Sequence, residues 1–198
     1  MYNISELNSI IKHRRSIYPN EYIRGKAIPD EIIWQILENA NHAPNHKQTE
    51  PWRFTVFSGN GLKYFAELQA RIYKENAGEN FRQPRYEKLL SYPLMSSHVI
   101  VIGMKRSEKK NLLPEIEEII AVACALENMF LTVTAHGLGS YISTAGITYM
   151  KEAKPFFNLN QEDKLIGFLY IGYPTEQSIT VSKRVPIGDK VTWINKDE

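Results

Sequence analysis

The sequence predicts a mixed α+β fold, because segments with helical periodicity alternate along the chain with short apolar segments typical of strands. Isoleucine, leucine and alanine recur at helical spacing over residues 32–40, residues 99–104 are continuously apolar, and residues 114–136 form a long apolar segment. No internal repeat or low-complexity stretch interrupts this alternation. With 198 residues, of which 43% are hydrophobic, the chain is long enough for one full core. We therefore expect a single domain over residues 1–198.

Composition excludes several classes of function. A net charge of +2 with dispersed basic residues gives no field strong enough for nucleic acid or an anionic membrane to be the main partner. A single cysteine, Cys124, excludes an intramolecular disulfide, and its apolar helical surroundings favour inert burial. The N-terminus lacks the charged and then apolar profile of a secretory signal, so we expect a cytoplasmic protein.

The N-terminal segment combines a short helix with a cluster of cations. Helical spacing over residues 6–11 predicts an amphipathic helix behind a cap at Ser5. The helix leads into Arg14, Arg15 and Ser16, and two guanidinium groups beside a hydroxyl are suited to hold a phosphate. Both arginines could instead cap the helix, because cations are favoured at a helix C-terminus.

A polar and aromatic loop over residues 43–54 separates the helix predicted at 32–40 from a strand predicted at Trp52–Ser58. Its side chains include His46, Lys47 and Gln48, which offer donors and a positive charge to a flat heterocycle. We therefore predict a ligand-binding loop, although an ordinary surface loop would have the same composition. His42, at the end of the preceding helix, is either a further ligand contact or a C-terminal cap.

The middle of the chain contains the remaining strands. A helix is expected from Leu62 to Glu75, whereas residues 76–92 are polar and contain glycine and proline, which predicts a mobile excursion or lid. The apolar run at 99–104 predicts a strand covered on both faces. A third strand is expected at 166–172, and Pro174 ends it.

Residues 114–136 predict one long helix, with proline in its first turn and Gly137 just past its end. This helix is apolar nearly all round. Glu127 and Asn128 lie in its middle and argue against a membrane span. A chain of this size has little room to bury a helix on every side, so we expect part of it to lie at a subunit interface.

Four segments, in this order, resemble the nitroreductase family of flavin mononucleotide (FMN) enzymes, and the resemblance extends from Ile10 to Pro186. They are Arg14-Arg15-Ser16, the loop from Ala43 to Phe54 with its Pro-Trp-Arg-Phe ending, the segment Gly137 to Gly146, and Lys183-Arg184-Val185-Pro186. The resemblance implies a mainly antiparallel central sheet flanked by helices, in a homodimer with FMN sites at the subunit boundary. It also implies hydride transfer from NADH or NADPH to nitroaromatic or quinone-like acceptors by a ping-pong mechanism.

The resemblance also assigns residues to the two ends of the flavin. Arg14, Arg15 and Ser16 would hold the phosphate, assisted by Lys183 and Arg184, although these last two could form a solvated basic tail. The ring would lie against Ile142, Ser143 and Thr144, where small residues let the backbone approach a flat ligand, even though Gly137 must also cap the preceding helix. His46 and Gln48 would contact the ring from the loop, and His42 would do so from the partner subunit.

The sequence departs from the family pattern in the loop and near the clamp. Gln48 and Glu50 stand where the family usually has asparagine and glutamine, and Tyr18 stands where many members have a basic residue. Lys47 replaces that missing charge, or nothing does. Three alternatives stay open: a non-enzymatic flavin carrier or sensor, a flavin-dependent dehydrogenase or oxidase on the same fold, and a binding module without cofactor. No metal site is expected, because His42 and His46 alone do not make one.

Overall fold

The computed structural model describes residues 2–108, 113–176 and 183–194. Within these residues, four strands form one antiparallel sheet in the order β1-β2-β4-β3. The strands are β1 (Trp52–Ser58), β2 (His98–Met104), β3 (Gly139–Ser143) and β4 (Lys164–Gly172). The predicted α+β class with a mainly antiparallel sheet is confirmed, as are the strands expected at 52–58, 99–104 and 166–172. The sequence did not predict β3 as a strand.

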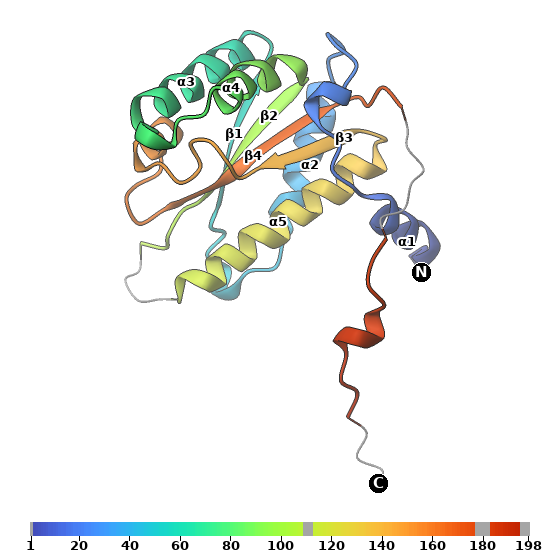
Figure 1. The fold of residues 1–198 in the computed structure, drawn as a ribbon. Helices are drawn as coiled ribbons and strands as arrows, with labels where there is room; N and C mark the ends of the chain where they lie inside the picture. Colours follow the sequence, from blue (N-terminus) through green and yellow to red (C-terminus); the bar gives the residue numbers. More distant parts are fainter. Residues whose placement is uncertain (1, 109–112, 177–182, 195–198) are drawn as a thin grey trace.

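Helices cover both faces of this sheet (Figure 1). On one face lie α3 (Asn60–Asn76) and α4 (Gln83–Met95), and on the other lie α2 (Asp30–Asn41) and α5 (Glu115–Ala135). The first helix, α1 (Ile4–His13), contacts α5. Short 3₁₀ turns over 19–21, 46–48, 78–80, 151–157 and 187–190 connect or follow these elements.

The two faces of the sheet carry separate apolar cores, because successive strand residues point to opposite sides. Val99, Val101 and Phe168 pack toward α3 and α4. Ile100 and Ile102 pack with α2 and α5. Every residue of β2 is buried, so the expected strand covered on both faces is confirmed.

The structure corrects the prediction for residues 76–92. This segment is largely helical: α3 continues to Asn76 and α4 begins at Gln83. Pro84 lies in the first turn of α4, where a helix tolerates proline because that amide has no intrahelical partner. Leu89 is buried against α3, and its carbonyl accepts a hydrogen bond of 2.5 Å from Nε2 of the buried Gln69.

The structure also corrects the cap of the first helix. The side chain of Asn3, not Ser5, accepts hydrogen bonds from the amides of Ser5 and Glu6, at 3.0 and 3.4 Å. No residue of α1 is buried, and its apolar side chains Ile4, Leu7 and Ile11 are exposed. Ile10 is half-buried, so most but not all of the apolar face of this helix is uncovered within one chain.

The long apolar helix α5 is likewise only partly covered. Within the described residues, α5 alone is long and apolar enough to cross a membrane by these two criteria. However, 44% of its most apolar 18-residue stretch is buried inside the protein. A core helix satisfies the same criteria, and six residues of α5 are buried in the core that it shares with α2: Ala121, Val122, Ala125, Met129, Phe130 and Val133. Ile116 and Ile120 remain exposed, and the expected subunit interface at this helix stays a prediction.

Candidate functional site

The segment predicted to support a flavin ring begins at the turn between α5 and β3. Gly137 has a φ of +66°, and its amide donates to the carbonyl of Thr134 at 3.0 Å. The next amide, of Leu138, donates to Val133 at 3.0 Å, which completes a glycine-ended helix terminus. The predicted capping role of Gly137 is therefore confirmed, and the turn directs the chain into β3.

The predicted phosphate clamp lies directly beside β3. Ser16 forms a parallel bridge with Ser140, and the amide of Ile17 donates to the Ser140 carbonyl at 2.9 Å. A side chain at Gly139 would come within about 3.0 Å of Tyr22 and 3.2 Å of Ile17, so this glycine makes room for the N-terminal segment rather than for a ligand. Two of the segments predicted to bind one molecule are thus neighbours within one chain.

The side chains of the clamp are accessible but anchored. Arg14 is half-buried at the C-cap of α1, and its guanidinium carbon lies 5.6 Å from the ring centroid of Phe130 in α5. This contact keeps the guanidinium beside β3 without neutralising its charge. Arg15 is also half-buried, and Ser16 is exposed. The cap position foreseen for Arg14 and an anion-binding role are therefore compatible.

At the other end of β3, the three predicted ring contacts face different directions. Ile142 packs against the core shared by α2 and α5. Ser143 lines a cavity on the side of α4, and Thr144 is exposed just past the strand. Gly146 follows with a φ of +70°, and a side chain there would come within 2.9 Å of Leu89 in α4. The chain therefore turns closely past α4 at the place predicted to meet the ring.

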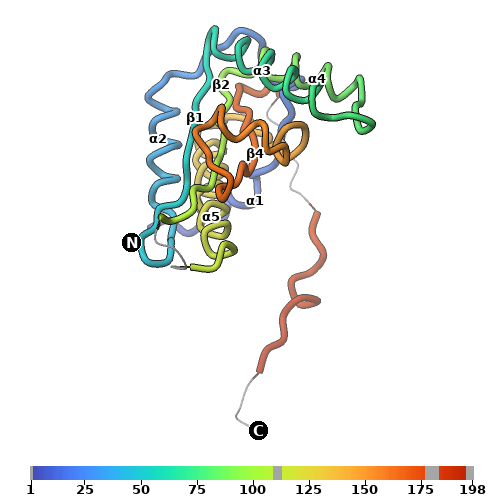
Figure 2. The backbone as a smooth tube through the Cα atoms, turned by 90° about the vertical axis from the view of Figure 1, so that its left-hand side faces the viewer, coloured from blue at the N-terminus to red at the C-terminus, as the bar shows by residue number. Residues whose placement is uncertain are grey.

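The two basic residues from the end of the chain do not join this group. Lys183 and Arg184 are exposed, and the segment 183–194 lies apart from the sheet and helices in Figure 1 and in the perpendicular view of Figure 2. This segment also exposes five large apolar side chains: Val185, Ile187, Val191, Trp193 and Ile194. Within one chain, the structure does not bring Lys183 and Arg184 to the clamp.

The predicted loop is strained, and a contact between His46 and Glu117 ties it to α5. Lys47, Gln48 and Glu50 all have positive φ, of 53°, 50° and 43°. Such backbone conformations cost about 1 kcal/mol or more each for residues other than glycine, and they gather at functional sites. Nδ1 of His46 lies 2.6 Å from Oε2 of Glu117 in α5. Asn45 holds the other side of the loop, because its Oδ1 accepts from the amide of Glu50 at 3.0 Å.

The loop and the clamp lie near opposite ends of α5. His46 pairs with Glu117 near the start of the helix, whereas Arg14 stacks on Phe130 near its end. Thirteen residues of α-helix separate these two contacts by about 20 Å. His42, at the C-cap of α2, pairs with Glu38 at 3.3 Å and lines a surface pocket with Asn128 and Thr132 in the second half of α5. The predicted ring contacts of the loop and the clamp therefore do not meet within one chain.

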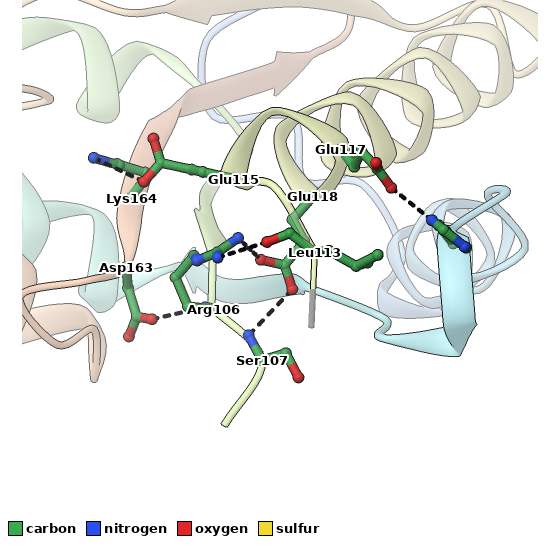
Figure 3. A network of polar contacts seen from close by, with 9 residues as sticks. Arg106, Ser107, Leu113, Glu115, Glu117, Glu118, Asp163 and Lys164 are labelled. Atoms are coloured by element: carbon green, nitrogen blue, oxygen red, sulfur yellow. Dashed lines mark hydrogen bonds and ion pairs between the residues drawn. The ribbon is translucent and has the colours of Figure 1, made fainter. Parts of the chain in front are cut away.

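Three acidic residues at the start of α5 connect it to separate segments (Figure 3). Glu115 pairs with Lys164 of β4 at 3.2 Å, and Glu117 pairs with the loop as described. Glu118 is 1% exposed, contacts Nη1 of Arg106 and accepts from the amide of Ser107 at 3.1 Å. No periodic pattern in the sequence identifies this network, because its contacts join the turn before α5 to the helix and to distant residues such as Lys164.

Arg106 has a central position in this network (Figure 3). Its Nη2 donates to the carbonyl of Leu113 at 2.9 Å, and its amide donates to Oδ1 of Asp163 at 2.8 Å. These contacts fix the start of α5, and therefore its register along the sheet. The described residues contain no group of three or more histidine, cysteine, aspartate or glutamate side chains that could hold a metal ion.

Comparisons with known proteins identify this arrangement. The sequence model described as Nitroreductase family matches residues 11–173. The chain belongs to the nitroreductase family. The Bacillus subtilis protein YfhC, named provisionally as an NAD(P)H nitroreductase, is 28% identical over 189 residues, which cover 95% of this chain and 94% of YfhC. The predicted resemblance is thus confirmed at the level of the family.

Solved nitroreductase structures share the fold. A nitroreductase-like family protein from Bacillus cereus aligns with a TM-score of 0.80 and 25% identity, covering 98% of both chains. The FMN-dependent nitroreductase NfnB from Mycobacterium smegmatis, solved in complex with NADPH, aligns with a TM-score of 0.75 and 17% identity, covering 98% of this chain and all of NfnB.

The family match includes the clamp, the loop and β3, but it ends at Tyr173. The basic pair Lys183 and Arg184 therefore lies outside the part of this nitroreductase that the family model covers. The residues that are present fit an FMN molecule in their chemistry, because the half-buried guanidinium groups lie beside the start of β3 and a cavity opens at its other end, next to Ser143 and Gly146.

Proposed function

We propose that this chain is an FMN-dependent oxidoreductase that takes hydride from NADH or NADPH and reduces nitroaromatic or quinone-like acceptors by a ping-pong mechanism. The observation that carries the proposal is the hydrogen-bonded contact between the Arg14-Arg15-Ser16 segment and β3. This contact puts donors for a phosphate next to the strand that leads to Ser143 and Thr144. Membership of the nitroreductase family, and the activities named for YfhC and NfnB, support the same reaction class.

The protein's own groups have limited tasks in such a reaction. Arg14, Arg15 and Ser16 bind the phosphate through charge-assisted hydrogen bonds. Ile142 and the following backbone support one face of the ring, and the hydroxyl of Ser143 or Thr144 reaches its edge. When bound, FMN supplies the hydride chemistry itself, so no side chain of the protein needs to act as a nucleophile or base.

A second copy of the chain completes the proposed site. Because the loop lies about 20 Å along α5 from the clamp, we propose that His46 and Gln48 reach the ring from a partner subunit, and that His42 joins them from that subunit. Oγ1 of Thr49, buried in this loop, has no hydrogen-bond partner among the described residues. That hydroxyl is inaccessible within the single chain, so the strained and exposed backbone at Lys47, Gln48 and Glu50 is what supports a contact with another molecule here.

Exposed apolar side chains give the proposed homodimer its contact surface. Ile116 and Ile120 are exposed on α5, and Leu7 and Ile11 on α1. The segment 183–194 carries further apolar side chains away from its own chain, and we propose that it packs on the partner and thereby brings Lys183 and Arg184 to a flavin phosphate. Light scattering during gel filtration tests the dimer, and a monomer at micromolar concentration contradicts it.

Anaerobic mixing of the purified protein with NADH or NADPH tests the proposed activity. Rapid bleaching of the flavin absorbance, followed by reoxidation on addition of a nitroaromatic or quinone, is the expected result. A flavin that stays oxidised with both donors identifies a carrier or sensor instead. A flavin that reacts with a reduced substrate but not with NADH or NADPH identifies a dehydrogenase or oxidase. A protein that does not take up FMN at all is a binding module without this cofactor.

Arg14→Glu tests the clamp. Hydrogen bonds to charged groups contribute about 1.5–3 kcal/mol, so reversing this charge should weaken FMN binding by about tenfold or more. The free energy of unfolding of the FMN-free protein should fall by less than about 1 kcal/mol, because the change removes the contact with Phe130. Lys12→Glu, in the exposed last turn of α1, is the matched control and should retain FMN. If both variants bind FMN equally well, Arg14 is only a helix cap.

A further inference from the structure

A cavity of about 350 Å³ opens between α4 and the ends of β3 and β4. Its volume lies within the range of small-molecule sites in proteins. Ser143 and Gly146 form one side, next to the predicted ring contacts, and Leu89 of α4 forms another. The cavity is therefore adjacent to the place where the proposed function puts the reacting end of the flavin.

The mouth of this cavity is positively charged. Arg82, Arg85 and Lys88, all exposed on α4, line it, and no acidic side chain is among the described lining residues. Arg82 uses Nη1 to donate to the carbonyls of Glu79 and Phe81, at 3.0 and 2.8 Å. Lys88 and Arg85 have no such bond among the described contacts, so their charges remain available to a ligand. The nearest acid on the helix, Glu87, accepts a hydrogen bond from Gln83 at 2.9 Å.

The inner wall of the cavity is aromatic. Tyr92 meets Tyr141 and Tyr170 edge to face, with ring centroids 6.4 and 6.3 Å apart. Nζ of Lys88 lies 5.9 Å from the centroid of Tyr92, so the cationic mouth and the aromatic wall adjoin. Burial raises the pKa of Tyr170 above its ordinary value, and burial and then the neighbouring Tyr18 raise the pKa of Tyr141. The phenols of Tyr141 and Tyr170 therefore stay neutral at physiological pH and do not repel an anion.

We propose that this cavity is an acceptor subsite that selects flat aromatic compounds carrying a carboxylate or another anionic group. The ring of the acceptor would pack against Tyr92 and Tyr141, and its anionic group would pair with Arg85 and Lys88. This proposal rests on the proposed function, because the flavin at Ser143 is what makes a ligand of this cavity an electron acceptor.

The affinity for two matched ligands tests the proposal. Isothermal titration of the FMN-loaded, oxidised protein with 4-nitrobenzoate and with 4-nitrobenzamide compares an anion with a neutral molecule of almost the same shape. An ion contact of about 1 kcal/mol corresponds to about fivefold in affinity, so the carboxylate should bind at least about fivefold more tightly. The double variant Arg85→Ala/Lys88→Gln should lose this preference while its affinity for the amide changes less than about twofold.

A second double variant controls for net charge. Arg71→Ala/Lys74→Gln removes the same two charges from a neighbouring groove lined by α3, and it should keep the preference for the carboxylate. Equal affinities for the two ligands in the unaltered protein overturn the proposal, as does a preference that survives in Arg85→Ala/Lys88→Gln. Loss of FMN from that variant on gel filtration also overturns it, because the cations would then serve the cofactor.

The titration contains no NADH or NADPH, so its result does not depend on turnover. Bleaching of the same preparation by a nicotinamide donor tests the proposed function separately. If the protein prefers the carboxylate but its flavin is not reduced by either donor, the anion-selective cavity is supported and the proposed reductase activity is refuted.

Discussion

Glu118→Gln should destabilise the protein more than the same change at Glu115 or Glu117, the other two acidic residues at the start of α5. The carboxylate is 1% exposed and accepts from both Arg106 and the amide of Ser107. A glutamine of the same shape keeps one acceptor oxygen but turns an amide NH₂ group toward a donor. The substitution also removes the negative charge that balances Arg106 in a largely buried place. Breaking a buried ion pair from one side costs about 3–5 kcal/mol. For a chain of 198 residues, each kcal/mol lowers the melting temperature by about 2–4 °C.

Thermal and urea unfolding at one fixed protein concentration measure this effect, because stability in a dimer depends on concentration. Glu115→Gln, which breaks the half-exposed pair with Lys164, is the control and should cost less than about 1 kcal/mol. The double variant Arg106→Met/Glu118→Leu should be more stable than Glu118→Gln, since it leaves no unpaired charge. Equal and small effects of Glu118→Gln and Glu115→Gln would refute the reasoning.

Two further predictions concern pH and the anchoring of the N-terminal segment. Burial lowers the pKa of His98 below its usual value of about 6.5, although Asp30, at 3.5 Å, partly opposes the shift. The unfolded chain therefore binds more protons than the folded chain below about pH 6.5, so the free energy of unfolding should fall with decreasing pH by at most about 1.4 kcal/mol per pH unit. His98→Gln should flatten that slope in unfolding experiments at pH 5 to 8. An unchanged slope contradicts the assignment of this pH dependence to His98. Gly172→Ala would force a side chain into the ring of Tyr22, which holds the carbonyls of Ile17 and Tyr170, and should cost about 1–3 kcal/mol and lower FMN retention. Gly61→Ala is the control, because the nearest atom to the added methyl group is 3.7 Å away, and its stability should stay within about 1 kcal/mol of the unaltered protein. Similar stabilities for the two variants would show that Tyr22 moves aside without cost.

The inner strands of the sheet, β2 and β4, could be predicted from the sequence because buried strands are recognisable as apolar runs. The continuous apolar run of β2 is buried on both faces, and the glycine after α5 ends the helix where predicted. These features depend on local residue types, and tertiary contacts only reinforce them.

Other features depend on contacts that a single segment does not show. Residues 139–143 are rich in small and polar side chains, and they become a strand because they pair with β4 and with Ser16. Residues 83–95 become α4 because Pro84 is tolerated in a first helical turn and Leu89 finds cover on α3. The pairing of Arg106 with Glu118 joins the segment after β2 to the first turn of α5, and no periodic pattern marks it because these residues belong to different elements.

The candidate site could be predicted in part. The sequence resemblance grouped the clamp with the segment after Gly137, and the structure brings these two segments together. It also grouped the loop and the basic pair Lys183-Arg184 with them, and neither reaches the clamp within one chain. Residues from two chains can share a site without any signal in the sequence of one chain. Within one chain, the length of α5 separates the loop from the clamp.

A mixed-dimer experiment tests most directly whether two chains share each flavin site. Arg14→Glu removes the clamp from one chain, and His46→Ala/Gln48→Ala removes the loop from another. Each variant alone should retain little FMN. If the two variants are unfolded, mixed in equal amounts and refolded, about half of the dimers should be mixed, and each mixed dimer should have one intact site, so flavin content should recover to about a quarter of that of the unaltered protein. No recovery above the separate variants would contradict the account, because each site would then lie within a single chain.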